Sequence, residues 1–228
     1  MARQPGPTYA RQVSSTRSRP SYHHGSLRET LVRACLELIE AEGIGAVSLR
    51  RVAREAGVSP GAPYHHFADR TALLTAIAVQ GFQLLEARMR EARDVAPTPI
   101  AALPALVEAY VRFAREQPAH FHLMFRPELA APRHDPAARC AGDAAFEVVC
   151  EVVDECRRDG SVPAGGSAVV PGMCWALGHG LASLWVDGPL VERGAGLAPA
   201  PEALVEQIAQ GLSAILAGAA RAGVRLQP

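Results

Sequence analysis

The sequence predicts an all-α protein, in which a three-helix head is joined by one long helix to a larger helical body. Apolar residues recur at helical spacing along the chain. Capping residues and Gly or Pro breaks divide the chain into segments of helical length, and no alternating strand pattern persists. The chain has 228 residues, of which 49% are hydrophobic, so it can bury a substantial core.

Charge is distributed unevenly, although the formal net charge is zero. Residues 1–70 hold 10 Arg against 6 acids, and residues 71–228 hold 13 Arg against 17 acids. A basic front on an acidic rear is typical of a DNA-facing module carried on a separate body. Residues 1–24 hold four Arg and no acid, which predicts a disordered basic arm. This arm is either a plain leader or a segment that touches DNA phosphates.

Cysteine usage and one apolar stretch bear on the compartment. The five cysteines are an odd number and form no CxxC pair, so we expect no disulfide framework and a reducing cytoplasm. Residues 167–186 carry no charged side chain and reach membrane-spanning length. They also contain Pro171 and three glycines, which favours a helix buried in protein and no membrane partner.

Capping signals place the helices of the head. Ser26-Leu-Arg-Glu29 forms a capping box that predicts the start of the first helix. A second helix is expected to begin at its N-cap, Ser48, and to end at Gly57. Ser59 then predicts the N-cap of a short third helix, with Pro60 at its first position and an end near Phe67.

The body is expected to follow from a long fourth helix. Asp69 is its predicted N-cap and Arg93 its approximate end, and Pro97-Thr-Pro99 breaks the chain. Gly/Pro/Ala-rich loops are expected at 160–166 and 188–201. The remaining helices are predicted near 99–116, 118–125, 136–158, 165–187 and 201–221.

The segment 48–67 has the pattern of a helix-turn-helix. Gly57 permits the positive φ that a tight turn needs, and Ala53 is small where the next helix crosses closely. Such a unit presents its second helix to the DNA major groove. The alternative is that Ser48 and Ser59 act only as caps and that Tyr64 belongs to the core. The candidate DNA-contacting residues are Ser48, Leu49, Ser59, Pro60, Gly61, Ala62, Tyr64, His65 and Arg70.

Residues 25–85 resemble the DNA-binding head of the TetR family of bacterial regulators. The resemblance rests on Glu42-Gly43, on the run from Val52 to Ser59, on Tyr64-His65-His66-Phe67 and on Leu73-Leu74. Arg70 stands where the family usually has Lys, which keeps a cation for phosphate. Pro63 is unusual in the recognition helix. It lies in the first turn after Ser59, so we expect no intrahelical hydrogen bond to be lost, although a groove-side donor is removed.

Residues 86–228 resemble, less completely, a branch of the family with a Trp–His–Gly signature, here Trp175, His179 and Gly180. Pro118-Ala-His120-Phe121 and Met124-Phe125 look similar too. The resemblance implies a small-molecule pocket enclosed by the fifth to eighth helices. The candidate effector residues, most of which could equally be plain core, are Phe113, Phe121, Met124, Phe125, Phe146, Cys150, Met173, Trp175 and His179.

The same resemblance implies a homodimer formed by 165–187 and 201–221. The first segment is apolar on more than one face, so a single core is not expected to hide it. Small residues four apart let helices approach closely, and they occur twice in this segment: Gly172, Ala176 and Gly180, and Cys174, Gly178 and Ala182.

Taken together, the residues predict a cytoplasmic transcriptional regulator, on the nucleoid when bound to DNA. The expected mode is a repressor released from a palindromic operator by a small-molecule effector. An activating or redox-responsive regulator of the same fold is the alternative, and a small helical enzyme is least favoured. No Gly-rich phosphate loop, HExxH or nucleophile elbow occurs. His120 and His122 diverge on a helix, so no metal or cofactor is expected.

Overall fold

The computed structural model describes residues 24–125, 135–166, 168–190 and 200–226. The predicted arm therefore lies outside the described residues, except for His24. The prediction of an all-α fold is confirmed, with one pair of very short strands that the sequence did not reveal. The elements are α1 His24–Glu42, η1 Ile44–Ala46, α2 Leu49–Glu55, η2 Ala62–His65, α3 Arg70–Val95, α4 Pro99–Glu116, α5 Pro118–Phe125, α7 Pro136–Arg158, β1 Ala164–Gly165, α8 Val169–Val186, α10 Pro201–Arg221 and β2 Arg225–Leu226, where η marks a 3₁₀ turn.

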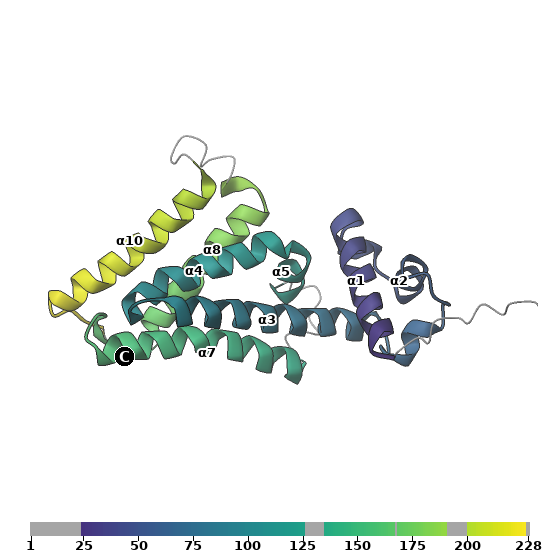
Figure 1. The fold of residues 1–228 in the computed structure, drawn as a ribbon, viewed down its shortest axis with the longest axis horizontal. Coiled ribbons are helices and arrows are strands. Elements are labelled where there is room, and N and C mark those ends of the chain that lie inside the picture. Colours follow the sequence, from purple (N-terminus) through teal and green to yellow (C-terminus); the bar gives the residue numbers. More distant parts are fainter. Residues whose placement is uncertain (1–23, 126–134, 167, 191–199, 227–228) are drawn as a thin grey trace, which may run out of the picture.

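The helices form a head at one end of an elongated molecule and a layered body at the other (Figure 1). Helix α3 runs from the head through the body and packs against α4, α5 and α7. Helix α4 in turn packs against α8 and α10. The apolar stripe of α3 is buried throughout: Leu73, Leu74, Ile77, Phe82, Leu85 and Met89.

Buried apolar side chains form two clusters, one in the head and one in the body. The short helix α5 contributes to both. Ala119 and Leu123 belong to the head cluster, whereas Phe121 and Met124 belong to the body cluster. One face of α5 therefore packs in the core of the head, and another face packs in the core of the body.

Two helix starts differ from the sequence prediction. Helix α1 begins at His24, so Ser26 lies inside the helix and is not its N-cap. Helix α8 begins at Val169 rather than near 165, because Gly165 instead pairs in a parallel ladder with Leu226. Gly165 has a φ of +85°, and a Cβ there would lie 2.2 Å from the Leu226 carbonyl oxygen. Only glycine fits this close approach.

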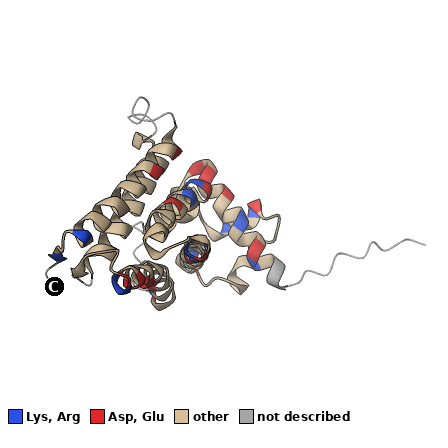
Figure 2. Cartoon of the chain, turned by 60° about the vertical axis from the view of Figure 1, so that its left-hand side comes forward, with Lys and Arg blue, Asp and Glu red and all other residues tan. Residues whose placement is uncertain are grey.

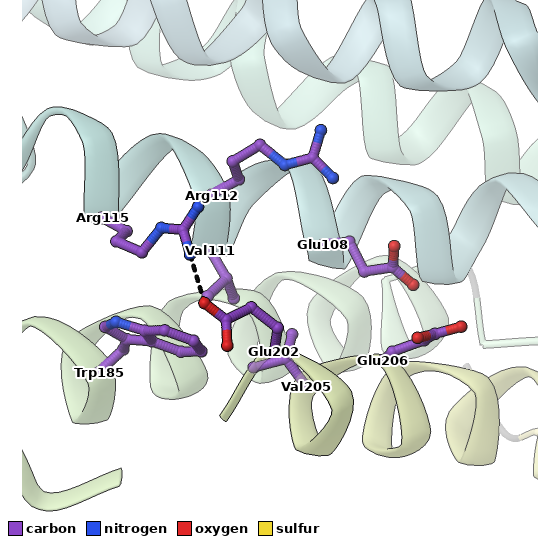
Figure 3. Close-up of a pocket in the computed structure, with 8 residues that line it drawn as sticks. All are labelled: Glu108, Val111, Arg112, Arg115, Trp185, Glu202, Val205 and Glu206. Atoms are coloured by element: carbon purple, nitrogen blue, oxygen red, sulfur yellow. Dashed lines mark hydrogen bonds and ion pairs between the residues drawn. The ribbon is translucent and has the colours of Figure 1, made fainter. Parts of the chain in front are cut away.

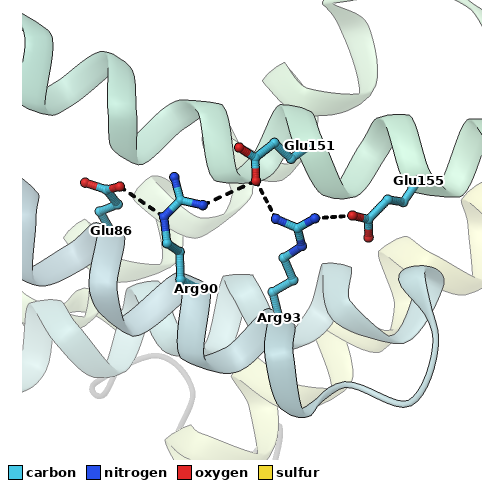
Figure 4. A network of polar contacts seen from close by, with 5 residues as sticks. All are labelled: Glu86, Arg90, Arg93, Glu151 and Glu155. Atoms are coloured by element: carbon cyan, nitrogen blue, oxygen red, sulfur yellow. Dashed lines mark hydrogen bonds and ion pairs between the residues drawn. The ribbon is translucent and has the colours of Figure 1, made fainter.

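Ion pairs hold α3 against α7 along the body (Figure 4). Arg90 donates to Glu86 on its own helix at 3.0 Å and to Glu151 on α7 at 3.3 Å. Arg93 bridges Glu151 and Glu155. The network joins the two helices at the end of the body away from the head, so it fixes α7 relative to the helix that emerges from the head.

Candidate nucleic-acid interface and ligand cavity

The turn of the helix-turn-helix is built as the sequence predicts. The Ser48 hydroxyl accepts from the Arg51 amide at 3.2 Å and caps α2. Helix α2 ends in a Schellman motif: the Gly57 amide donates to Arg54 at 3.1 Å, and the Val58 amide donates to Ala53 at 2.9 Å. Gly57 has the expected positive φ, at 67°, and Ala53 is fully buried.

The third element is a 3₁₀ turn, and the predicted helix with Ser59 as N-cap is wrong. The turn begins only at Ala62. A helix capped by Ser59 would use that residue's carbonyl to accept from the amide of residue 63, but Pro63 has no N–H. The Ala62 amide takes this acceptor instead, at 3.0 Å, which closes a tighter turn. The expectation that Pro63 removes no intrahelical hydrogen bond is therefore also wrong.

This turn places an exposed surface over two buried anchors. Pro63 and Phe67 are buried beneath it. Two side chains of the turn are exposed: Tyr64 is 53% exposed, and His65 is exposed beside it. The sequence-predicted residues Ser48, Ser59, Pro60 and Gly61 are exposed as well, and Ala62 is half-buried. Leu49 is 5% exposed and lies in the head core, so it supports this surface from below.

Arg70 is turned into the head. Its Nε donates to the Val47 carbonyl at 2.9 Å, and its Nη2 donates to the Ile44 carbonyl at 2.8 Å. The guanidinium thereby joins the start of α3 to the segment that enters α2. Two of its three nitrogens are used inside the protein, which assigns Arg70 a structural part beside the phosphate contact expected from the sequence.

Two exposed cations on α2 are not among the DNA-contacting residues predicted from the sequence. Arg50 and Arg54 stand one turn apart and are both exposed. Their neighbour Arg51 is paired with Glu42, and Arg54 lies 3.5 Å from the Glu55 carboxylate on its own helix while staying exposed. The spacing of four residues between the two arginines is visible in the sequence, but the exposed face could be assigned only once Leu49, Val52 and Ala53 were seen to be buried.

A cavity of about 350 Å³ opens between α3, α5, α7 and α8. Four of its nine lining residues are aromatic. Phe82 and Phe125 pack edge to face at 5.5 Å, and Phe146 and Trp175 do so at 5.4 Å. The full lining is Phe82, Met124, Phe125, Ala138, Arg139, Gly142, Asp143, Phe146 and Trp175.

A smaller cavity of about 180 Å³ lies between α4, α8 and α10 and has a different character (Figure 3). Arg115 donates to Glu202 at 2.6 Å and lies over the Trp185 ring. Burial raises the pKa of Glu108, and the nearby Glu206 raises it further. Five of its eight lining residues are charged, so this is a polar groove and not an apolar ligand pocket.

Comparison with known proteins decides the family. The model "Bacterial regulatory proteins, tetR family" matches residues 31–77, which is the head. The model "Tetracyclin repressor-like, C-terminal domain" matches residues 103–212, which is most of the body. The chain belongs to the tetR family of bacterial regulators. It is therefore a DNA-binding transcriptional regulator and not an enzyme, as the sequence predicts. Members of the tetR family bind operator DNA and small-molecule effectors and act as dimers.

Solved structures agree with this tetR-family fold. A protein of unknown function from Rhodococcus sp. RHA1 is 33% identical, with a TM-score of 0.74 over 87% of this chain and 100% of that one. The regulator PfmR from Thermus thermophilus is 19% identical, with a TM-score of 0.65 over 81% and 97%. The ketosteroid regulator KstR2 of Mycobacterium tuberculosis is 20% identical, with a TM-score of 0.59 over 88% and 97%.

The effector residues predicted for this tetR-family regulator divide into two groups. Met124, Phe125, Phe146 and Trp175 line the apolar cavity. The other five do not. Phe113 and Phe121 lie in the body core, Cys150 is half-buried on α7, Met173 is exposed on α8, and His179 bonds to the Tyr110 hydroxyl at 3.1 Å.

Sequence reasoning missed Phe82 and the α7 residues Ala138, Arg139, Gly142 and Asp143. A signal for the α7 wall exists in the sequence. Ala138 and Gly142 precede Phe146 at four-residue spacing, which leaves room on the helix face beneath the ring.

A substitution of Arg70 can distinguish its role in stabilising the head from a contact with DNA phosphate. We expect Arg70→Lys to lower the free energy of unfolding by about 1–2 kcal/mol, because an ammonium cannot span both carbonyls as the guanidinium does. Chemical denaturation of the whole chain measures this. Arg54→Lys, an exposed arginine on α2, is the control and should leave stability unchanged. Unchanged stability in Arg70→Lys would assign the residue to DNA alone.

Proposed function

We propose that the chain is a homodimeric repressor, which leaves a near-palindromic operator when an effector occupies the cavity between α3, α5, α7 and α8. One observation carries the DNA-binding part of this proposal. Tyr64 and His65 are held outward on a turn that Pro63 and Phe67 anchor from below, next to the capped start of α2. Arg50 and Arg54 add exposed cations for phosphate on the neighbouring helix.

An exposed apolar stripe on α8 supports the dimer. It consists of Val169, Met173, Ala176, Gly180 and Leu184, which share one helix face. Val169, Met173 and Leu184 are 43%, 41% and 46% exposed, which is high for side chains of this kind. The other face packs inside the chain, where Gly178 lies against the Tyr110 ring. The stripe is therefore left for a second copy.

Helix α10 continues the apolar surface. Ile215 is 67% exposed, and charge occurs only toward the two ends of the helix (Figure 2). Both α8 and α10 are long and apolar enough to cross a membrane by composition alone, with a mean hydropathy of 1.3, and are only 33% and 17% buried. Burial against the same pair of helices in a partner accounts for this composition in a DNA-binding regulator.

Release of DNA is expected to depend on the distance between the two DNA-binding heads of the dimer. Recognition elements of a dimer must stand about 34–36 Å apart to enter successive major grooves. An effector that favours another separation shifts the population away from the DNA-bound state, by no more than its difference in affinity for the two states. Because its target is DNA, we place the protein in the cytoplasm.

Three of the five thiols are poorly suited to a redox-responsive mode, because they are buried. Burial raises the pKa of Cys35 and of Cys174 to about 12 and that of Cys156 to about 11. Such thiols stay protonated at neutral pH and react slowly. No disulfide joins the five cysteines, all of which lie in the described ranges.

Salt dependence of operator binding tests the proposal. Fluorescence anisotropy with labelled DNA from upstream of the gene should give a Kd that rises steeply between 50 and 200 mM salt, by roughly 10³-fold or more for about six phosphate contacts. Arg50→Gln combined with Arg54→Gln should flatten the slope of log K against log salt by about two. A flat response in the unaltered protein would contradict phosphate-based binding.

A further inference from the structure

The wall of the apolar cavity presents the faces and edges of aromatic rings. Four aromatic side chains form two edge-to-face pairs, Phe82 with Phe125 and Phe146 with Trp175. The Met124 thioether lies in the same wall. Aromatic rings and a polarisable sulfur pack favourably against another flat ring.

Tyr110 and His179, which lie behind the Phe125 ring, are hydrogen-bonded to each other. The Tyr110 hydroxyl and His179 Nδ1 lie 3.1 Å apart. Burial raises the pKa of Tyr110 and lowers that of His179, so both groups are neutral at pH 7 and the hydroxyl can donate to the imidazole. The Phe125 ring packs on the imidazole at 4.5 Å. Neither Tyr110 nor His179 is among the residues that line the cavity.

The cavity does have polar partners on α7. Arg139 and Asp143 line it one turn apart, and both are exposed. Among the described residues, neither side chain has a hydrogen-bond or ion-pair partner. The pair thus offers a donor and an acceptor side by side, which a single group that both accepts and donates would satisfy.

We propose that the effector is a flat, mainly apolar ring compound that carries a hydroxyl group. Its ring lies against Phe82, Phe125 and Trp175, and its hydroxyl accepts from Arg139 and donates to Asp143. This inference rests on the proposed function, because it takes this cavity as the effector site. A linear amphiphile should bind more weakly, because its flexible chain has no flat face to pack against the aromatic rings.

Isothermal titration calorimetry on the full chain tests the ligand class, with 2-naphthol, naphthalene and dodecanoate as probes. We expect 2-naphthol to bind about tenfold tighter than naphthalene, which lacks the hydroxyl. Dodecanoate should bind more weakly than 2-naphthol. In Arg139→Ala/Asp143→Ala the preference for 2-naphthol over naphthalene should fall to about one. Failure of 2-naphthol to bind, tighter binding of dodecanoate, or an unchanged preference in this variant would each overturn the proposal.

The two tryptophans provide a matched control for the site. Trp175→Ala should weaken 2-naphthol binding at least tenfold, whereas Trp185→Ala, in the polar groove, should leave it unchanged. Gly142→Leu, which fills the cavity from α7 without removing a core side chain, should also abolish binding. Equal losses in Trp175→Ala and Trp185→Ala would place the ligand elsewhere.

Operator binding is followed separately. Binding of 2-naphthol without release of DNA would leave the ligand class standing and remove the effector role. Operator binding by a chain that does not bind 2-naphthol would remove only the ligand class.

Discussion

Replacing Tyr64 and His65 together by alanine should reduce operator affinity at least 100-fold while the protein stays folded. Each side chain is exposed, so its loss should change stability by no more than about 0.5 kcal/mol. A DNA contact of this kind is worth about 1–3 kcal/mol, and the two contacts together account for the expected loss. Anisotropy titration with operator DNA measures the affinity, and thermal unfolding checks the fold.

The matched control uses an exposed pair remote from the head. Glu147→Ala combined with Asp154→Ala removes two exposed side chains of α7 and should leave operator binding intact. Operator binding that survives in the Tyr64/His65 variant would show that the exposed turn is not the DNA-reading element, whatever the fold of the head.

The second large effect is expected at the α8 stripe. Met173→Asp combined with Leu184→Asp places two carboxylates on the face proposed to meet a second copy. Burying unpaired charge is costly, so the dimer should dissociate at micromolar concentration. Sedimentation velocity would then report a monomer. Operator affinity should fall by about 10²-fold or more, because two linked half-site contacts become one.

Val95→Asp is the control for this variant. Val95 is 77% exposed at the end of α3 and lies outside the stripe. The substitution makes the same kind of change, from an exposed apolar residue to a carboxylate, but it should leave the dimer and operator binding intact. A double variant at Met173 and Leu184 that remains dimeric would move the interface to another surface.

In the head, short sequence patterns predict the helix caps correctly but not the type of every helix. Ser48 and Asp69 cap their helices as predicted, because a side-chain oxygen followed by free amides depends on only three or four residues. Pro60 alone would fit the first position of a helix, but Pro63 three residues later does not fit the first turn. Pro63 lacks the amide that would close the first turn, and this loss decides between an α-helix and a 3₁₀ turn.

The cavity shows where sequence reasoning ends. The sequence offers Phe113, Phe121 and Met124 as equivalent candidates for the implied pocket, but only Met124 lines the cavity. Which apolar side chain fills a core and which lines an opening depends on how four helices cross. Periodicity within one helix carries no information on that. Arg139 and Asp143 were missed for the same reason, since only their position beside Phe146 and Trp175 gives them meaning.

The division of α5 between two cores bears on how the chain folds. Ala119 and Leu123 complete the head cluster, although they lie more than thirty residues beyond the predicted end of the head at 85. A fragment that stops there would expose the surface against which these side chains pack. Head and body should therefore unfold in one cooperative transition, and the boundary between binding roles is not a boundary between folding units.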